Sequence, residues 1–183
     1  MKKFLALALF VMTLATASAQ HMLFMGIPLD GTISEFTAEL EAKGINVSSS
    51  NKFIPTGART FEGMFYGKPS LIAVYYAPAT NIVYRAKAVI EDADFETLKQ
   101  LYDEISESIS NKYPGEHATD VQDGFECTTF KIDLGVYSDV FEGIVNLYFS
   151  TNEEEYPVTY NLHIDYTDTI NEAQYKSTIE DDL

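Results

Sequence analysis

The segment YPVTYNLHIDY, residues 156–166, alternates between apolar or aromatic side chains and polar ones more cleanly than any other part of the chain. Tyr160, Leu162 and Ile164 fall on one side of this alternation, and Thr159 and His163 fall on the other. A period of two residues is typical of a β-strand, whose successive side chains point to opposite faces. One apolar face and one polar face indicate an antiparallel sheet that packs on a core on one side and is exposed to water on the other.

Similar patterns occur on both sides of this segment. The acidic turn of residues 152–155 joins it to a strand at 143–150, and a short first strand is predicted at 21–25. Further strands are predicted at residues 59–66, 70–77, 81–91 and 125–134, with a weak one at Phe53–Ile54.

Two segments have a helical period instead. Thr32 and Glu35 match a capping box at the start of a helix over residues 33–43, and Gly44 is placed for its C-cap. Asp94 caps a longer helix over residues 94–112, which carries an unbroken apolar stripe and ends at Tyr113-Pro114-Gly115. The tail from Asp168 onward predicts a short third helix.

The strands follow one another rather than alternating with helices, which predicts an α+β fold. We expect an antiparallel sheet of about six to eight strands, packed on one face by the two main helices. A helix followed by strands occurs twice, and Phe61-Glu62-Gly63 recurs as Phe141-Glu142-Gly143, so two related halves are an open possibility. No linker divides residues 20–183, which we interpret as a single domain.

The N-terminus has the pattern of an export signal. Lys2 and Lys3 precede an apolar run, and Ala17-Ser18-Ala19 is a small-residue cleavage site. We therefore expect residues 1–19 to be a cleaved signal peptide and the mature chain to begin at Gln20, in the periplasm or outside the cell. The apolar run is too short to span a bilayer, and no later segment is long enough.

The chain has 12 basic and 28 acidic residues, and removal of residues 1–19 leaves 10 basic residues. A surface this acidic disfavours nucleic acid and anionic lipid as partners. It favours solubility, with attraction to basic proteins or cations as the alternative. Cys127 is the only cysteine, so it has no partner for an internal disulfide.

Phosphate-binding and hydrolytic motifs are absent from the sequence. Gly26 and Gly31 lack the spacing of a phosphate loop, and in the segment from Gly63 to Lys68 the spacing is one residue short, with Pro69 in place of the required hydroxyl. There is no G-x-S-x-G motif.

Histidine, cysteine and acidic residues also give no clear site. Cys127 and His163 are the only conceivable thiol–imidazole pair, and a cysteine in a strand is more often a core residue. His21 and His117 have no partner at ligand spacing. The acidic residues 153–155, and Asp165 with Asp168, lack the wrapped loop that calcium needs. We therefore nominate no catalytic, cofactor-binding or metal-binding residue.

Tyrosine is the remaining unusual feature, because the chain has twelve tyrosines and no tryptophan. Tyr75-Tyr76 places one ring on each face of a strand. Tyrosines on an uncovered sheet face would suit a binding surface, whereas tyrosines at the rim of a core would be structural.

Five segments resemble an uncharacterised family of small secreted proteins from Bacteroidetes: GIPLDGTISEFTAELEAKG, YRAKAVI, LYDEISESISNKYPG, EGIVNLYF and HIDYTDTINEAQ. The resemblance implies origin and export but no activity and no site residue. The arrangement of elements also resembles the helix-plus-sheet modules of the β-lactamase-inhibitor-protein type, which is an analogy of fold alone.

These observations predict a non-enzymatic exported binding or interaction protein of the bacterial envelope, with an unidentified protein or small molecule as its partner. The alternative is a periplasmic hydrolase or an enzyme inhibitor whose site forms only in the folded chain. A cleft with converging carboxylates would favour an enzyme.

Overall fold

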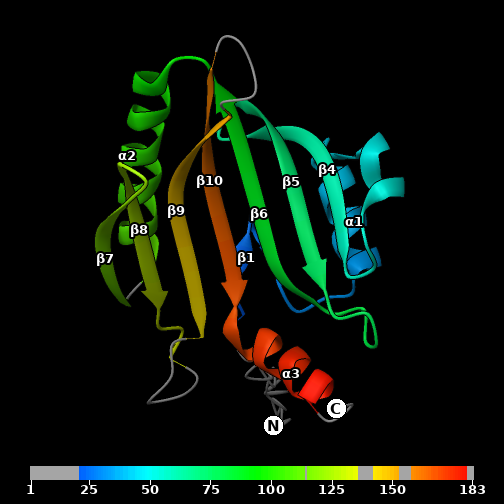
Figure 1. Ribbon diagram of the computed structural model, residues 1–183. Helices are drawn as coiled ribbons and strands as arrows, with labels where there is room; N and C mark the ends of the chain where they lie inside the picture. Colours follow the sequence, from blue (N-terminus) through cyan, green and yellow to red (C-terminus); the bar gives the residue numbers. More distant parts are fainter. Residues whose placement is uncertain (1–20, 114, 136–141, 153–157, 181–183) are drawn as a thin grey trace, which may run out of the picture.

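The computed structural model describes residues 21–113, 115–135, 142–152 and 158–180. The expected signal peptide at residues 1–19 and the acidic residues 153–155 lie outside the described residues. An eight-stranded antiparallel sheet forms the centre of the fold, in the order β3-β4-β5-β6-β10-β9-β8-β7 (Figure 1). Its strands are β3 (Asn46–Val47), β4 (Ala58–Phe65), β5 (Lys68–Tyr76), β6 (Val83–Asp92), β7 (Gly115–Gln122), β8 (Phe125–Ile132), β9 (Gly143–Asn152) and β10 (Thr159–Asp168).

The sheet consists of two halves with the same chain path. Helix α1 (Ile33–Ala42) precedes the meander β3 to β6, and helix α2 (Phe95–Lys112) precedes the meander β7 to β10. The last strands of the two meanders, β6 and β10, pair with each other at the centre of the sheet, where Ala88 lies opposite Ile164. The α+β prediction with two main helices is confirmed, and the two halves that the sequence left open are present in the topology.

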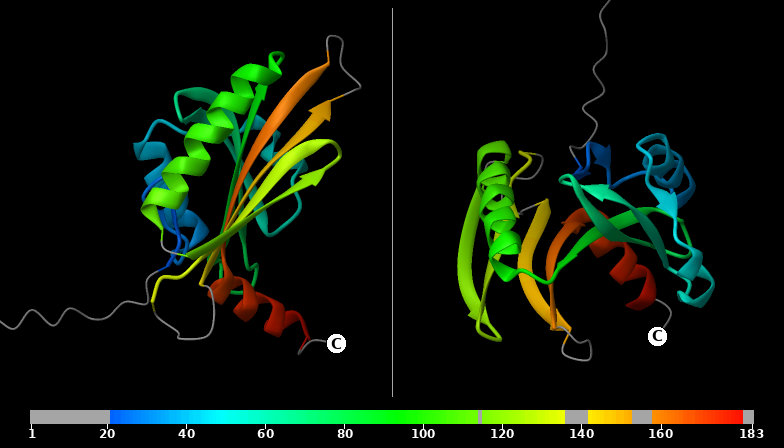
Figure 2. Two further views of the ribbon diagram at one scale, coloured as in Figure 1. Left: turned by 90° about the vertical axis from the view of Figure 1, so that its left-hand side faces the viewer. Right: turned by 90° about the horizontal axis from the view of Figure 1, so that it is seen from above.

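Helices α1 and α2 cover one face of the sheet, together with a small hairpin made of β1 (Leu23–Phe24) and β2 (Ile27–Pro28) (Figure 2). Side chains from all of these elements meet in one core. Helix α2 contributes five buried side chains to it: Leu98, Leu101, Tyr102, Ile105 and Ile109. Burial of each such side chain stabilises the fold by about 1.5–3 kcal/mol before the entropy cost is counted.

Helix α3 (Thr169–Glu180) lies on the opposite face of the sheet, against β6, β9 and β10 (Figure 2). The ring of Tyr175 stacks on Tyr84 with 5.2 Å between their centroids. This face of β10 was expected to meet water, but Asp165 and Thr167 on it are buried. Burial of Asp165 is compatible with stability because Arg85 donates two hydrogen bonds to its carboxylate.

Several elements differ from the sequence prediction, among them the two-residue strands β2 and β3, which it did not include. The prediction of a weak strand at Phe53–Ile54 is wrong, because Ser49–Phe53 form a short 3₁₀ helix. Ser48 is the N-cap of this helix, and its side chain accepts a hydrogen bond from the amide of Ser50. The edge strand β7 was not predicted at all, since all eight of its residues are exposed and their sequence has no apolar alternation. No helix in the described part of the chain is long and apolar enough to cross a membrane.

Candidate functional site

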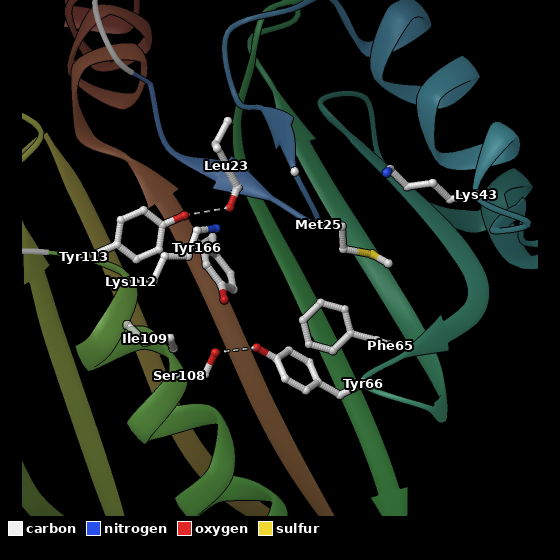
Figure 3. A pocket seen from close by; sticks show the side chains of 11 residues that line it. Leu23, Met25, Lys43, Phe65, Tyr66, Ser108, Ile109, Lys112, Tyr113 and Tyr166 are labelled. Atoms are coloured by element: carbon white, nitrogen blue, oxygen red, sulfur yellow. Dashed lines mark hydrogen bonds between the residues drawn. The ribbon is translucent and has the colours of Figure 1, made fainter.

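A cavity of about 570 Å³ opens on the helical side of the sheet, where the C-terminal ends of α1 and α2 approach the β1–β2 hairpin (Figure 3). Its volume lies in the range that small-molecule sites occupy. The cavity is lined by Leu23, Met25, Gly26, Lys43, Phe65, Tyr66, Ser108, Ile109, Lys112, Tyr113 and Tyr166.

Two tight hairpin turns deliver side chains to this cavity. Met25-Gly26 connects β1 to β2, and Tyr66-Gly67 connects β4 to β5. All four residues have positive φ, as two-residue type I′ turns require. Asn, Asp or Gly normally occupies the first position, because other side chains are strained there. Asp123, at the same position in the β7–β8 turn, follows this preference.

Met25 and Tyr66 therefore adopt a backbone conformation that is unfavourable for residues with their side chains, and both line the cavity. A strained residue costs on the order of 1–3 kcal/mol, and such residues cluster at functional sites. The turn at Asp123 lies away from the cavity and carries an ordinary residue. This contrast links the two strained turn residues, Met25 and Tyr66, to the cavity that they line.

The floor of the cavity is apolar and aromatic. Phe65, Ile109 and Tyr166 are each less than a tenth exposed, and they belong to β4, α2 and β10 respectively. Phe24 stacks on Phe65 at 5.3 Å and meets Tyr166 edge-on at 5.5 Å, which fixes both rings from below.

Three tyrosine hydroxyls face the cavity. The Tyr66 hydroxyl donates to Ser108 Oγ at 3.3 Å, and the Tyr113 hydroxyl donates to the Leu23 carbonyl at 3.4 Å (Figure 3). Both distances are long for O–H···O bonds, so these hydroxyls are weakly engaged. The Tyr166 hydroxyl has no hydrogen-bond partner within the described ranges, and burial raises the pKa of its phenol, which keeps it a proton donor at neutral pH.

Lys43 and Lys112 provide the charge of the site. Figure 3 shows them on opposite sides of the cavity, Lys112 from the end of α2 and Lys43 beyond Met25. Neither has a carboxylate within 4.0 Å among the residues that the structure describes. No aspartate or glutamate lines the cavity.

The structure separates the thiol–imidazole pair considered from sequence. Cys127 of β8 lies opposite Tyr148 of β9, and Tyr148 lies opposite His163 of β10. The Tyr148 ring stacks on His163 at 4.5 Å, so an aromatic ring stands between the thiol and the imidazole. The expectation that Cys127 is a core residue is also wrong. Cys127 is partly exposed, and burial still raises the pKa of its thiol.

His163 instead contacts Ser150, a pair that the sequence did not reveal. Its Nε2 lies 2.7 Å from Ser150 Oγ on the neighbouring strand. Burial, reinforced by the charge of Lys87, lowers the pKa of His163 to about 4. Its Nδ1 is buried and has no partner in the described structure. A serine hydrolase orients its histidine through an acceptor on that nitrogen, and here this acceptor is missing among the described residues.

The remaining candidates have structural roles. Asp165 is held by Arg85, and Asp168 accepts hydrogen bonds from His21, Met22 and Asn171. No group of three potential metal ligands occurs among the described residues. At the start of α1 the Thr32–Glu35 capping box is present, so this helix start is closed by its own side chains.

His117 lies in β7, with its ring 5.6 Å from Phe130. Residues 153–155 lie outside the described ranges. The resemblance to small secreted Bacteroidetes proteins stays a prediction. No known family model matches this chain, and neither does any curated protein or solved structure.

Proposed function

We propose that this chain is a non-enzymatic exported protein of the bacterial envelope that binds a small, largely apolar ligand in the cavity between α1, α2 and the β1–β2 hairpin. The observation that carries the proposal is the cavity itself. Its buried apolar floor, its tyrosine hydroxyls and its volume match the usual composition of a ligand site.

The cavity supports binding better than catalysis. The lining residues include no carboxylate, histidine or cysteine, and a hydrolase needs a positioned base of this kind. The Ser150–His163 pair belongs to the face that α3 contacts, not to the cavity face, and its imidazole lacks an orienting acceptor among the described residues. The strained turn residues at the cavity rim supply a second reason to place the function there.

A neutral apolar fluorophore, N-phenyl-1-naphthylamine, tests the proposal directly. We expect saturable binding of one probe per chain to the purified protein. Ser108→Trp should weaken binding by about tenfold or more, because Ser108 is exposed and lines the cavity, so the indole fills the space without removing core atoms. Ser177→Trp, an equally exposed helical serine outside the cavity, is the matched control.

Two results would overturn this proposal. One is a wild-type protein that fails to bind either neutral or charged apolar probes. The other is a Ser108→Trp variant that binds as well as Ser177→Trp.

Export rests on the N-terminal sequence. We propose cleavage after Ala19, which leaves Gln20 as the first residue. The intact mass of protein recovered from the cell envelope tests this, since an uncleaved chain would retain the mass of residues 1–19.

A further inference from the structure

We infer that the ligand of this cavity is an amphiphilic anion, whose apolar body packs on Phe65 and Ile109 and whose charged head lies between Lys43 and Lys112. This inference rests on the proposed function, because it names the chemical class of the molecule that the cavity holds.

The charge distribution is the first argument. Acidic residues outnumber basic ones by 28 to 12 in the chain, yet the cavity lining contains two lysines and no acidic residue. Elsewhere in the described structure, Lys68, Lys99 and Lys176 each lie within 4.0 Å of a carboxylate, whereas Lys87 lies over the ring of Tyr148 instead. The cavity is thus a locally positive region in a strongly negative molecule, and it lacks the carboxylates that would neutralise it.

Helix ends offer a structural role for the same two lysines. Lys112 is the last residue of α2 and Lys43 is the C-cap of α1, where a cation offsets the negative end of the helix dipole. That dipole amounts to about half an elementary charge at each end, so a full ammonium at each end leaves the site net positive. The two helices are far apart in sequence, and their cationic ends still converge on one cavity.

The polar groups around the lysines match an anionic head. Lys112 Nζ lies over the ring of Tyr113, 4.6 Å from its centroid, which holds the ammonium beside the cavity wall. Burial raises the pKa of Tyr166 and so keeps its hydroxyl protonated. This hydroxyl has no acceptor among the described residues. Hydrogen bonds from O–H and N–H donors to an anionic oxygen are stronger than those to a neutral one.

A pair of ligands that differ only in the head group tests the inference. Decanoate and decanol are used to displace N-phenyl-1-naphthylamine at about pH 8, where the carboxylate is ionised. In low salt we expect decanoate to displace the probe at about tenfold lower concentration, although decanol is the more apolar molecule. Raising the salt concentration to about 0.5 M should reduce this advantage, since exposed charges are then screened.

Lysine variants localise the effect. The double variant Lys43→Met/Lys112→Met should weaken decanoate binding by about tenfold and change decanol binding by less than about twofold. Lys68→Met/Lys176→Met removes the same charge at positions outside the cavity and serves as the matched control. Lys112→Arg should bind decanoate about as well as the wild type, because it keeps the charge.

The outcomes separate the two proposals. If the neutral probe binds but decanoate has no advantage over decanol, or loses no affinity in Lys43→Met/Lys112→Met, the anionic ligand is refuted and the cavity proposal stands. If no apolar probe binds at all, the cavity proposal itself fails.

Discussion

His21 Nδ1 donates a 2.7 Å hydrogen bond to Oδ2 of Asp168, and so joins the first described residue to the end of the last strand. The Asp168 side chain is fully buried and also accepts from the backbone amides of Met22 and Asn171. A single carboxylate therefore fixes the N-terminal segment and the first turn of α3. The N-terminal segment leads directly into the β1–β2 hairpin that forms one wall of the cavity.

Asp168→Ala should lower the free energy of unfolding by about 2–4 kcal/mol. The substitution leaves the amides of Met22 and Asn171 buried without an acceptor, and an unsatisfied buried donor costs about 1–3 kcal/mol. Urea denaturation followed by circular dichroism measures the change. Asp120→Ala, at an exposed aspartate of β7, should change stability by less than about 0.5 kcal/mol, and equal stability of the two variants would contradict the role of Asp168.

Gly143→Ala should destabilise the fold by about 1–3 kcal/mol through a steric clash. A Cβ at residue 143 would lie 2.1 Å from Sδ of Met22, which is fully buried and cannot move away freely. Met22→Ala alone should cost about 2–4 kcal/mol by leaving a cavity. In the double variant the clash is gone, so we expect a total loss at least about 1 kcal/mol smaller than the sum of the single losses. Additive losses would show that the two residues do not meet in this way.

The sequence predicted those elements whose periodicity was strong. The alternation in residues 156–166 and the apolar stripe of α2 correspond to the central strand β10 and the longest helix. β7 escaped prediction because its residues face solvent and carry no pattern. The repeated Phe-Glu-Gly did not mark equivalent positions either, since Gly63 lies in β4 and Gly143 begins β9. Both glycines sit where a Cβ would strike a core side chain.

The cavity could not be predicted because no short segment contains it. Its residues come from the β1–β2 hairpin, the end of α1, the β4–β5 turn, the end of α2 and β10. The only local signals were Met25-Gly26 and Tyr66-Gly67, which place bulky residues where a tight turn favours Asn or Asp. The Ser150–His163 contact depends on the register of β9 against β10, which alternation within one strand does not determine.

Acidification should destabilise the protein in part through His163. Burial and the nearby Lys87 hold its pKa at about 4, below the ordinary value of 6.5. The unfolded chain binds the proton more readily, so acidification below about pH 6.5 favours unfolding. The stability that depends on the neutral histidine is therefore complete above about pH 6.5 and is lost as the pH drops toward 4. Between pH 7 and pH 5 we expect it to account for about 1–2 kcal/mol of lost stability, after allowance for its partial exposure to solvent.

The His163 contribution is isolated by comparison with His163→Gln. Urea unfolding at both pH values should show a smaller loss of stability in the variant, by that same 1–2 kcal/mol. Carboxylates that titrate in both proteins cancel from the difference. An imidazole that titrates near 6.5 in an NMR measurement, or an identical pH dependence in the two proteins, would refute this prediction.

Tyr66→Asn should separate stability from ligand binding. Asparagine tolerates the φ of +47° at this position better than tyrosine does. The relief of backbone strain should raise the free energy of unfolding by about 0.5–1 kcal/mol. Loss of the ring contact with Phe65, at 5.1 Å, offsets that gain, so the free energy of unfolding should change by less than about 1 kcal/mol. Binding of N-phenyl-1-naphthylamine should nevertheless weaken by about fivefold or more, because an aromatic wall of the cavity is removed. Asp123→Asn makes the matched change in the β7–β8 turn and should alter neither quantity. A Tyr66→Asn variant that is markedly more stable and binds the probe unchanged would mean that the strained tyrosine serves no ligand.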